Sequence, residues 1–354
     1  MYSKVKIFLF LSVFMVAVSC KKESGSTSQP PVVPPPAANN FTNPLLTTGP
    51  DPWVVKKDSF YYYMHTMGGS IEIWRTKKMS DLKNAPHFTV WSAPSSGPYS
   101  RNVWAPELHF INNKWYLYFA ADDGNNANHR MYVLENTNAD PLSANWVFKG
   151  KIADATDKWA IDGSVMEKDG QLYFLWSGWE GNTDGRQDIY IALMSDPYTI
   201  SGNRVLISSP TFDWERFGGP AYVNEAPEAL KSPAGKNFIT YSASGCWTDN
   251  YTLGLLSLKD NGNPLLVADW VKTTTPVFAQ SSASAAYGPG HNSFFKSVSG
   301  TEDWILYHAN SAPGQGCGNA RNPRIQKFTW NADGTPNFGT PVKINTAIQK
   351  PSGE

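Results

Sequence analysis

Three acidic residues lie in short motifs, and each motif begins an apolar, aromatic-rich segment of the chain. Asp51 stands in GPDPWVV, Asp162 in WAIDGSVM and Glu225 in VNEAPEAL. A protonated carboxyl group can donate a proton to a leaving oxygen, and an ionised carboxylate can remove a proton from water. Acids at corresponding positions of segments that should be buried are costly unless they have a function. The three acids therefore indicate general acid–base chemistry, with Asp51 and Glu225 as the best pair.

The surrounding segments recur along the chain, and this repeat predicts the fold. Each copy has an opening segment, a polar turn and an aromatic segment, as in DPWVV followed by SFYYYMHT. Five copies recur at intervals of 55 to 64 residues, marked by Asp51, Pro106, Asp162, Glu225 and Pro289. This interval suits a four-stranded propeller blade with long loops. Later strands include RMYVLEN, DIYIALMS and, in the last copy, TPVKI, and no window predicts an amphipathic helix. The sequence thus predicts an all-β, five-bladed β-propeller over residues 41–354.

In a propeller the first strand of each blade lines the central channel, so equivalent positions converge on one axis. The residues expected there are Asp51, Glu107 or Trp104, Asp162, Glu225 and His291. We expect Asp51 to act as general base and Glu225 as general acid, with an anionic Asp162 raising the pKa of Glu225 and orienting it. Strand alternation is expected to turn Glu228 to the opposite face from Glu225. Glu107 is either a substrate contact or a structural one.

Hydrolysis of a glycosidic bond requires such a pair of carboxyl groups. The motifs GPDPWVV, NVWAPELHF, AIDGSVM, VNEAPEAL and YGPGHNSF, in this order, resemble those of glycoside hydrolase family 43, and the likeness extends over nearly all of residues 41–350. The resemblance implies Asp51 as base, Asp162 as pKa modulator and Glu225 as acid in an inverting mechanism. The Asp-Pro-Asn-Gly and Arg-Asp-Pro motifs of the retaining families 32 and 68 are missing. Inversion predicts carboxyl groups about 6.5 to 9.5 Å apart.

The resemblance also implies roles for a histidine and an arginine. His291 is similar to the family's axial histidine, which faces a hydrated calcium or other ion, and water would have to complete the shell because calcium prefers oxygen. The alternative is a hydrogen bond from His291 to Asp162 or a nearby acid. Arg321 stands where family members place an arginine that reaches the sugar in the −1 subsite, and Arg324 is its rival. No cofactor is expected for the chemistry, and a structural calcium at the axis stays open.

The composition favours an uncharged, flat-faced ligand. The chain has a formal net charge of zero, which gives no broad field to attract nucleic acid or an acidic membrane surface. Aromatic residues make up 14% of the chain, including 14 Trp, which suits a protein that stacks on sugar rings. The candidates for stacking are Trp53, Trp104, Trp176 and Trp179, with Trp104 favoured and at least one of the others expected in the core. The loops DDGNNANHR and SGCWTDN are expected to form the rim of the pocket.

The N-terminal residues predict export. Residues 1–20 resemble a bacterial lipoprotein signal peptide that ends at Cys20, the expected site of lipidation, and residues 21–40 form a Ser/Gly/Pro-rich tether. We therefore expect a monomer that is lipid-anchored to the outer membrane, on its periplasmic or cell-surface face. Cys246 and Cys317 form either one disulfide or two free thiols, and no His/Cys cluster predicts a zinc site.

Within the family, the segments INNKWYLYF, DKWAIDGSV, SGCWT and YGPGHNSF look most like those of exo-acting arabinofuranosidases. The resemblance implies removal of terminal α-L-arabinofuranose from arabinan or arabinoxylan. β-Xylosidase and endo-arabinanase activities are the enzymatic alternatives. A non-catalytic glycan-binding propeller is the alternative from another class.

Overall fold

The computed structural model describes residues 39–354, and these form strands and five short 3-10 helices without any α-helix. The all-β prediction is confirmed for this part of the chain. The predicted signal peptide, Cys20 and all but the end of the predicted tether lie outside the described residues. Within residues 39–354, no helix has the length and apolar character needed to cross a membrane.

Antiparallel strands that follow one another in the chain form five groups. The first group contains β2 (Trp53–Lys57), β3 (Phe60–Met64), β4 (Ser70–Thr76) and β5 (His87–Ser92). The second contains β6 (Arg101–Ile111), β7 (Lys114–Asp122), β8 (Arg130–Asn136) and β9 (Val147–Ile152). The third contains β10 (Ala160–Lys168), β11 (Gln171–Trp179) and β12 (Arg186–Asp196), with β13 (Thr199–Ile200) and β14 (Val205–Ser208) both paired to β12.

The fourth group contains β15 (Tyr222–Lys231), β16 (Asn237–Ala243), β17 (Thr252–Leu258) and β18 (Trp270–Lys272). The fifth contains β19 (Tyr287–Lys296), β20 (Asp303–Asn310), β21 (Asn322–Trp330) and β22 (Pro336–Asn337), and a separate pair joins β1 (Asn40–Phe41) to β23 (Ile348–Gln349). The 3-10 helices are η1 (Met79–Asn84), η2 (Asn126–Asn128), η3 (Asp213–Glu215), η4 (Val267–Asp269) and η5 (Ser282–Ser284).

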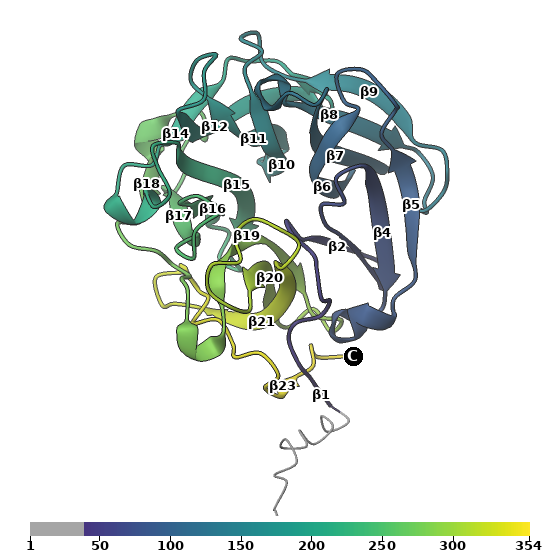
Figure 1. Ribbon diagram of the computed structural model, residues 1–354, viewed down its shortest axis with the longest axis vertical. Coiled ribbons are helices and arrows are strands. Elements are labelled where there is room, and N and C mark those ends of the chain that lie inside the picture. Colours follow the sequence, from purple (N-terminus) through teal and green to yellow (C-terminus); the bar gives the residue numbers. More distant parts are fainter. Residues whose placement is uncertain (1–38) are drawn as a thin grey trace, which may run out of the picture. The chain divides into compact units, whose positions relative to one another are not determined.

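The first strand of every group lies nearest the middle of the molecule in the view of Figure 1, and the last strands lie at the periphery. Each of β2, β6, β10, β15 and β19 contacts the first strands of both neighbouring groups, so these contacts run in a complete circle. A short parallel pairing of β12 with β15 also joins the third group to the fourth. Segments far apart in the sequence therefore meet around one centre.

Apolar cores fill the spaces between adjacent groups. One core combines residues of the second and third groups, such as Tyr118 in β7, Phe174 in β11 and Tyr190 in β12. Another combines Tyr63 in β3 with Leu306 in β20 of the fifth group. Because the middle strands are covered on both faces, their sequences read as almost continuous aromatic and aliphatic runs. Full burial of each such side chain stabilises the fold by about 1.5–3 kcal/mol.

The prediction of the last strand of the fifth group is wrong. TPVKI was expected to complete the group, but β22 occupies that edge at residues 336–337 and the TPVKI segment is not a strand. The amide of Val342, within this segment, donates to the side chain of Gln326 at 2.9 Å. A buried glutamine thus replaces the backbone partner that a strand would have supplied.

The first strands share a kink that the sequence does not reveal. In each group one residue has a positive φ at the same place: Asp51 (56°), Ala105 (43°), Asp162 (55°), Ala226 (51°) and His291 (46°). In β6, β10, β15 and β19 the pairing register also shifts there, as in a β-bulge. Bulges next to active sites redirect side chains and release backbone groups from the ladder.

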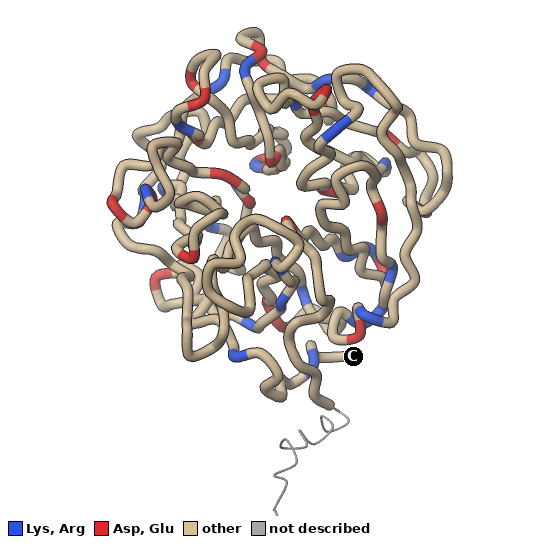
Figure 2. Tube along the Cα trace, in the orientation of Figure 1, with Lys and Arg blue, Asp and Glu red and all other residues tan. Residues whose placement is uncertain are grey.

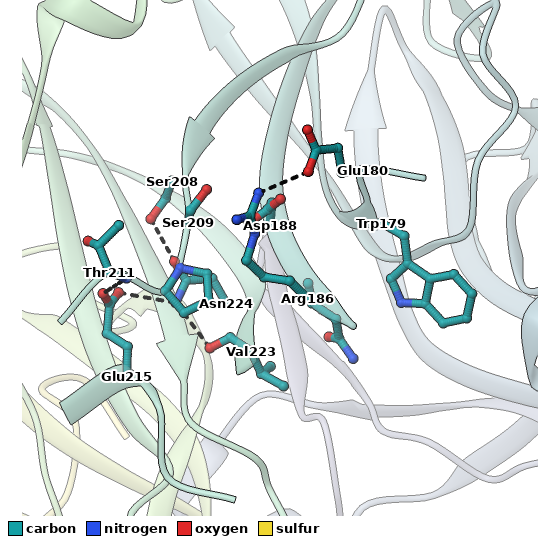
Figure 3. Close-up of polar contacts among 12 residues, drawn as sticks. Trp179, Glu180, Arg186, Asp188, Ser208, Ser209, Thr211, Glu215, Val223 and Asn224 are labelled. Carbon is teal, nitrogen blue, oxygen red and sulfur yellow. Dashed lines mark hydrogen bonds and ion pairs between the residues drawn. The ribbon is translucent and has the colours of Figure 1, made fainter. Parts of the chain in front are cut away.

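A buried polar network fixes the start of β15 between the third and fourth groups (Figure 3). Glu215 in η3 is fully buried and accepts hydrogen bonds from Asn224 Nδ2 at 3.1 Å and from the Tyr241 hydroxyl at 3.0 Å. Lys272 Nζ lies 2.6 Å from the same carboxylate. The hydroxyl of Ser208 in β14 donates to Asn224 Oδ1 at 2.7 Å. Because Asn224 directly precedes Glu225, this network helps to set the position of that acid.

Candidate functional site

One pocket contains the three acids that the sequence singled out. It has a volume of about 370 Å³, within the range of small-molecule sites. The predicted residues that line it are Asp51, Trp104, Asp162, Glu225, His291 and Arg321. Charged residues elsewhere are spread around the periphery with both signs interspersed (Figure 2), in keeping with the zero net charge. The concentration of acids in one pocket is therefore a local feature.

Asp51 precedes β2 and is held as an ionised carboxylate. Its Oδ1 lies 2.6 Å from Arg321 Nη1 and 3.3 Å from His291 Nδ1, and its Oδ2 accepts from the Thr66 hydroxyl at 2.7 Å. Burial by itself raises the pKa of Asp51, but the charge of Arg321, together with smaller contributions that include His291 and the hydrogen bond from Thr66, holds the pKa well below its usual range. Asp51 is consequently available as a proton acceptor throughout the neutral range.

The positive φ of Asp51 turns its amide toward a buried histidine. The amide donates to His308 Nδ1 at 3.1 Å, so Nδ1 must be an unprotonated acceptor. Burial holds the pKa of His308 well below its ordinary value, which agrees with a neutral ring. Although His308 Nδ1 is also 3.7 Å from Asp51 Oδ1, the two do not form an ion pair.

Glu225 in β15 is held in the opposite protonation state. Burial raises its pKa from 4.5 to about 7; the negative charge of Asp51 acts in the same direction, whereas a hydrogen bond from Tyr251 opposes it. The Tyr251 hydroxyl donates to Glu225 Oε1 at 2.8 Å. Nothing in the sequence pattern marks this tyrosine, because the loop between β16 and β17 brings it back beside the acid. Glu225 can therefore carry a proton near neutral pH.

Asp162 in β10 contacts the strand that carries Glu225. Its Oδ2 accepts from the amide of Ala226 at 3.0 Å, and that amide is free because Ala226 is the kinked residue of β15. The residue after Asp162 is Gly163, and there is no room for a side chain at this position because a Cβ would lie 2.4 Å from Phe174. The Asp-Gly sequence is thus part of a strand and does not form a turn.

The protonation of Asp162 differs from the expectation that this residue is an anion that raises the pKa of Glu225. Burial, followed by the charge of Glu225, raises the pKa of Asp162 well above its usual range. The pair Asp162 and Glu225 therefore retains a proton at neutral pH, and burial is the main reason that Glu225 is protonated. A permanently anionic Asp162 is not needed for this effect.

The expectation that Glu228 faces away from Glu225 is wrong. Glu225 pairs with Ser242 and Glu228 with Thr240, so three residues of β15 span two of β16 and the two acids share a face. Glu228 is buried and does not line the pocket. Burial, followed by the charge of Glu107 and a hydrogen bond with it, raises the pKa of Glu228 well above its usual range. Glu107 in turn contacts His109 Nε2 at 2.8 Å, so both acids belong to a structural cluster.

The four candidate tryptophans differ in whether they line the pocket, and Trp179 is described with its neighbour below. Trp104 lines the pocket and is stacked on His129 with the ring centroids 4.1 Å apart. Trp53 does not line the pocket: its indole Nε1 donates to the Leu108 carbonyl at 3.0 Å. Trp176 is buried in the core between the second and third groups and also lies outside the pocket lining.

Trp159 is a pocket residue that the sequence interpretation missed. It lies against Trp179 in a parallel stack with the ring centroids 4.7 Å apart, so Trp179 supports the pocket wall from the core. Its indole Nε1 donates to the Asn126 carbonyl at 2.8 Å, and Asn126 also lines the pocket. Its position directly before the AIDGSV motif was the available signal.

The two arginines are clearly separated. Arg321 lines the pocket and pairs with Asp51, whereas Arg324 is fully buried in β21 outside the pocket lining. Arg324 donates to the carbonyls of Ala285 and Asn310 at 2.9 and 3.2 Å and to neighbouring side chains. It is a structural residue of the fifth group.

The two cysteines of the described chain form a disulfide, which settles the open alternative. Cys246 and Cys317 are bonded across 71 residues of sequence, with their Cα atoms 5.2 Å apart. Both line the pocket. The bond connects the loop after β16 to the loop that carries Arg321.

The protein donors near the axis do not themselves form a calcium site. Among residues 39–354, no three His, Cys, Asp or Glu side chains are grouped so that they could hold a metal ion. His291 Nδ1 instead faces Asp51 at 3.3 Å, as in the alternative that placed this histidine beside a nearby acid.

Comparisons with known proteins agree with these observations. The family model described as "Glycosyl hydrolases family 43" matches residues 41–336. An "Extracellular exo-alpha-(1->5)-L-arabinofuranosidase" of Streptomyces avermitilis is 40% identical over 311 residues, which cover 85% of this chain and 64% of that protein. A protein of the same printed name from Streptomyces chartreusis is 34% identical over 274 residues, covering 76% of this chain and 82% of the relative.

A solved structure described as the "Crystal structure of alpha-L-arabinofuranosidase from Lactobacillus brevis" is similar with a TM-score of 0.81 and 36% identity. The match covers 86% of this chain and 98% of that one. The chain spans less than two thirds of the length of several curated relatives, 64% in the case of the Streptomyces avermitilis protein.

Proposed function

Because this chain belongs to glycosyl hydrolase family 43, we propose that it is an inverting glycoside hydrolase that releases terminal α-L-arabinofuranose from arabinan- or arabinoxylan-type polysaccharides. The names of the Streptomyces and Lactobacillus relatives support this choice of sugar. We also propose that the five antiparallel groups are the blades of a β-propeller, with β2, β6, β10, β15 and β19 as its innermost strands.

The observation that carries the proposal is the opposite surroundings of two carboxyl groups in one pocket: Asp51 is paired with Arg321, whereas Glu225 is buried beside the Tyr251 hydroxyl. The pKa of Asp51 is held well below its usual range, whereas that of Glu225 is raised to about 7. Two carboxyl groups whose environments separate their pKa values are suited to act as base and acid at the same pH. A surface cluster of acids would not show this separation.

The proposed reaction uses both groups in one displacement. Asp51 takes a proton from a water molecule while the water oxygen bonds to the anomeric carbon of the sugar. The bond from that carbon to the leaving oxygen breaks, and Glu225 gives its proton to the leaving oxygen. Asp162 orients Glu225 through the Ala226 amide and shares in retaining its proton. Arg321 and Trp104, which line the pocket, are the proposed sugar contacts.

The site can be tested with Asp51→Asn and Glu225→Gln variants on nitrophenyl α-L-arabinofuranoside, nitrophenyl β-D-xyloside and linear arabinan. Loss of a general acid or base is expected to lower kcat by about 10²- to 10⁴-fold. Glu167→Gln is a matched control, since this exposed acid lies on the same strand as Asp162 and should leave kcat unchanged. Proton NMR of the first-formed sugar should show inverted configuration at the anomeric carbon.

The alternatives have distinct outcomes in the same assays. Preferential cleavage of the xyloside indicates a β-xylosidase, and internal cleavage of arabinan indicates an endo-arabinanase. Glycan binding by the wild type without turnover indicates a non-catalytic binding protein. Full activity in both acid variants, or a product that retains its configuration, contradicts the proposed mechanism.

Export to an oxidising compartment is also proposed. The disulfide between Cys246 and Cys317 favours such a compartment, and the printed names of both Streptomyces relatives include the word extracellular. Lipidation at Cys20, the outer-membrane anchor, the monomeric state and a hydrated calcium near His291 remain predictions.

A further inference from the structure

One large apolar side chain at the pocket is exposed and yet fixed in place. Trp247 lines the pocket beside the disulfide, and 48% of its surface is exposed. Single exposed apolar residues are common on protein surfaces and need no explanation by themselves. The constraints on this indole distinguish it from an ordinary surface residue.

The indole of Trp247 is held by three independent features. Its Nε1 donates to the Gly218 carbonyl at 3.1 Å. A Cβ on Gly245 would lie 2.3 Å from Trp247 Cε2, and one on Gly218 would lie 2.5 Å from its Nε1, so two glycines allow the ring to lie against the main chain. The neighbouring Cys246 is covalently bonded to Cys317. Little side-chain entropy remains to be lost when a ligand stacks on such a ring.

The loop that carries Trp247 also supplies the hydrogen-bond partner of the proposed acid, and the disulfide at Cys246 ties it to the loop that carries Arg321. The loop runs from β16 to β17, and Tyr251 at its far end donates to Glu225. In the proposed reaction Glu225 protonates the leaving oxygen, so the leaving group must lie next to this acid. Asp51, which pairs with Arg321, is the proposed base and would act on the face of the released sugar opposite the leaving group.

We propose that Trp247 is a stacking platform for the leaving-group sugar, the residue of the polysaccharide from which arabinofuranose is removed. This assignment rests on the proposed function and adds a specificity-determining residue to it. An indole face packs against the C–H face of a sugar ring without requiring a particular pattern of hydroxyl groups. The platform therefore favours a saccharide over a small leaving group and does not select one linkage.

The test compares Trp247→Ala with wild type on a linear arabino-oligosaccharide. KM is expected to rise about twofold to tenfold, from the usual strength of an aromatic stacking contact, while inhibition by free L-arabinose, which occupies only the released-sugar side, stays unchanged. Trp247→Phe should restore most of the affinity. Phe217→Ala is the matched control, because Phe217 is also 48% exposed, lies on the adjacent loop and does not line the pocket.

A second measurement separates failure of the platform from failure of the proposed function. Calorimetry in the Glu225→Gln background measures oligosaccharide binding without turnover, and adding Trp247→Ala should weaken it by the same factor as KM. Equal KM in wild type and Trp247→Ala, or an equal loss of L-arabinose inhibition, overturns the platform even when the enzyme is active. If no sugar is released by the wild type but Trp247→Ala still weakens binding, the platform stands and the proposed hydrolysis does not.

Discussion

At the scale of single residues, the pocket depends on how each acid is surrounded. Asp51 is contacted by a guanidinium, an imidazole and a hydroxyl, whereas Glu225 receives one tyrosine hydroxyl and is otherwise buried. Their different environments, and not their residue types, separate the two pKa values. The sequence could mark both residues as candidates but could not show which partners surround them.

The hydroxyl of Tyr251 affects the pKa of Glu225, the proposed proton donor. Its hydrogen bond stabilises the ionised form of Glu225 and so lowers the pKa of that acid, which burial raises to about 7. In the proposed mechanism Glu225 acts in its protonated form, so activity should fall as pH rises through about 7 in the wild type. Tyr251→Phe removes the donor, so the pKa rises and the alkaline limb of the kcat/KM profile should move to higher pH.

The matched control for this prediction is Tyr307→Phe. Tyr307 is likewise fully buried, and its hydroxyl donates to Gln326 outside the pocket. Its removal should leave the pH profile where it is. A Tyr251→Phe profile that coincides with the wild-type profile would show that Glu225 is not the group titrating on the alkaline side.

Much of the site at this scale could be predicted because the reactive residues lie within recognisable motifs. Asp51, Asp162, Glu225, His291, Arg321 and Trp104 were selected in this way and line one pocket. Tyr251, Thr66 and Trp159 were not selected, since a tyrosine, a threonine or a tryptophan beside a strand usually belongs to the core. Tyr251 and Thr66 lie in loops whose paths no local pattern specifies, whereas Trp159 directly precedes the AIDGSV motif.

At the scale of the element, the kinks in the first strands do the positioning. A residue with positive φ releases its amide from the ladder: the Ala226 amide reaches Asp162, and the His291 amide reaches Ser242 Oγ at 2.8 Å. The Ala105 amide reaches Thr66 Oγ1 at 2.7 Å, and Thr66 in turn donates to Asp51. The main chain of one strand thus holds a side chain of the proposed catalytic site on another.

The strain in these kinks can be measured at Ala226, where an alanine has φ of 51°. The left-handed region costs a non-glycine residue about 1–2 kcal/mol. Ala226→Gly removes this strain from the folded state. The gain offsets the stability that is usually lost when glycine makes the unfolded chain more flexible and a buried methyl group is removed. Its free energy of unfolding should remain within about 0.5 kcal/mol of wild type in urea titrations.

Ala243→Gly in β16 is the comparison variant, because Ala243 is equally buried and has no positive φ. There the free energy of unfolding should fall by about 1 kcal/mol or more, from added backbone entropy and lost burial. Equal losses in the two glycine variants would mean that the kink in β15 carries no strain.

The strand assignments illustrate what a periodic sequence does and does not specify. The aromatic segments were identified because burial on both faces requires long apolar runs. The bulges were not, and so Glu228 was assigned to the wrong face by simple alternation. TPVKI has the composition of a strand, but the amide of Val342 within it bonds to the side chain of Gln326 and not to the backbone of a neighbouring strand.

At the scale of the whole molecule, the disulfide joins the fourth and fifth groups at the pocket. A cross-link across 71 residues restricts the unfolded chain strongly. The double variant Cys246→Ser/Cys317→Ser should therefore lose about 2–5 kcal/mol of unfolding free energy in urea titrations.

A reducing agent provides the control for this prediction. Dithiothreitol should lower the stability of the wild type toward that of the double variant and should not affect the double variant. If the variant and the wild type unfold at the same urea concentration, the surrounding packing and not the covalent bond holds these loops together.

The five corresponding positions of positive φ also have a consequence for how such a protein can change by mutation. Asp51, Asp162 and His291 carry an ionisable side chain at this position, whereas Ala105 and Ala226 carry only a methyl group. Aspartate and asparagine tolerate this backbone conformation better than most residues do. One substitution of Ala105 or Ala226 by aspartate or asparagine would therefore add a polar group at a backbone position that already suits it.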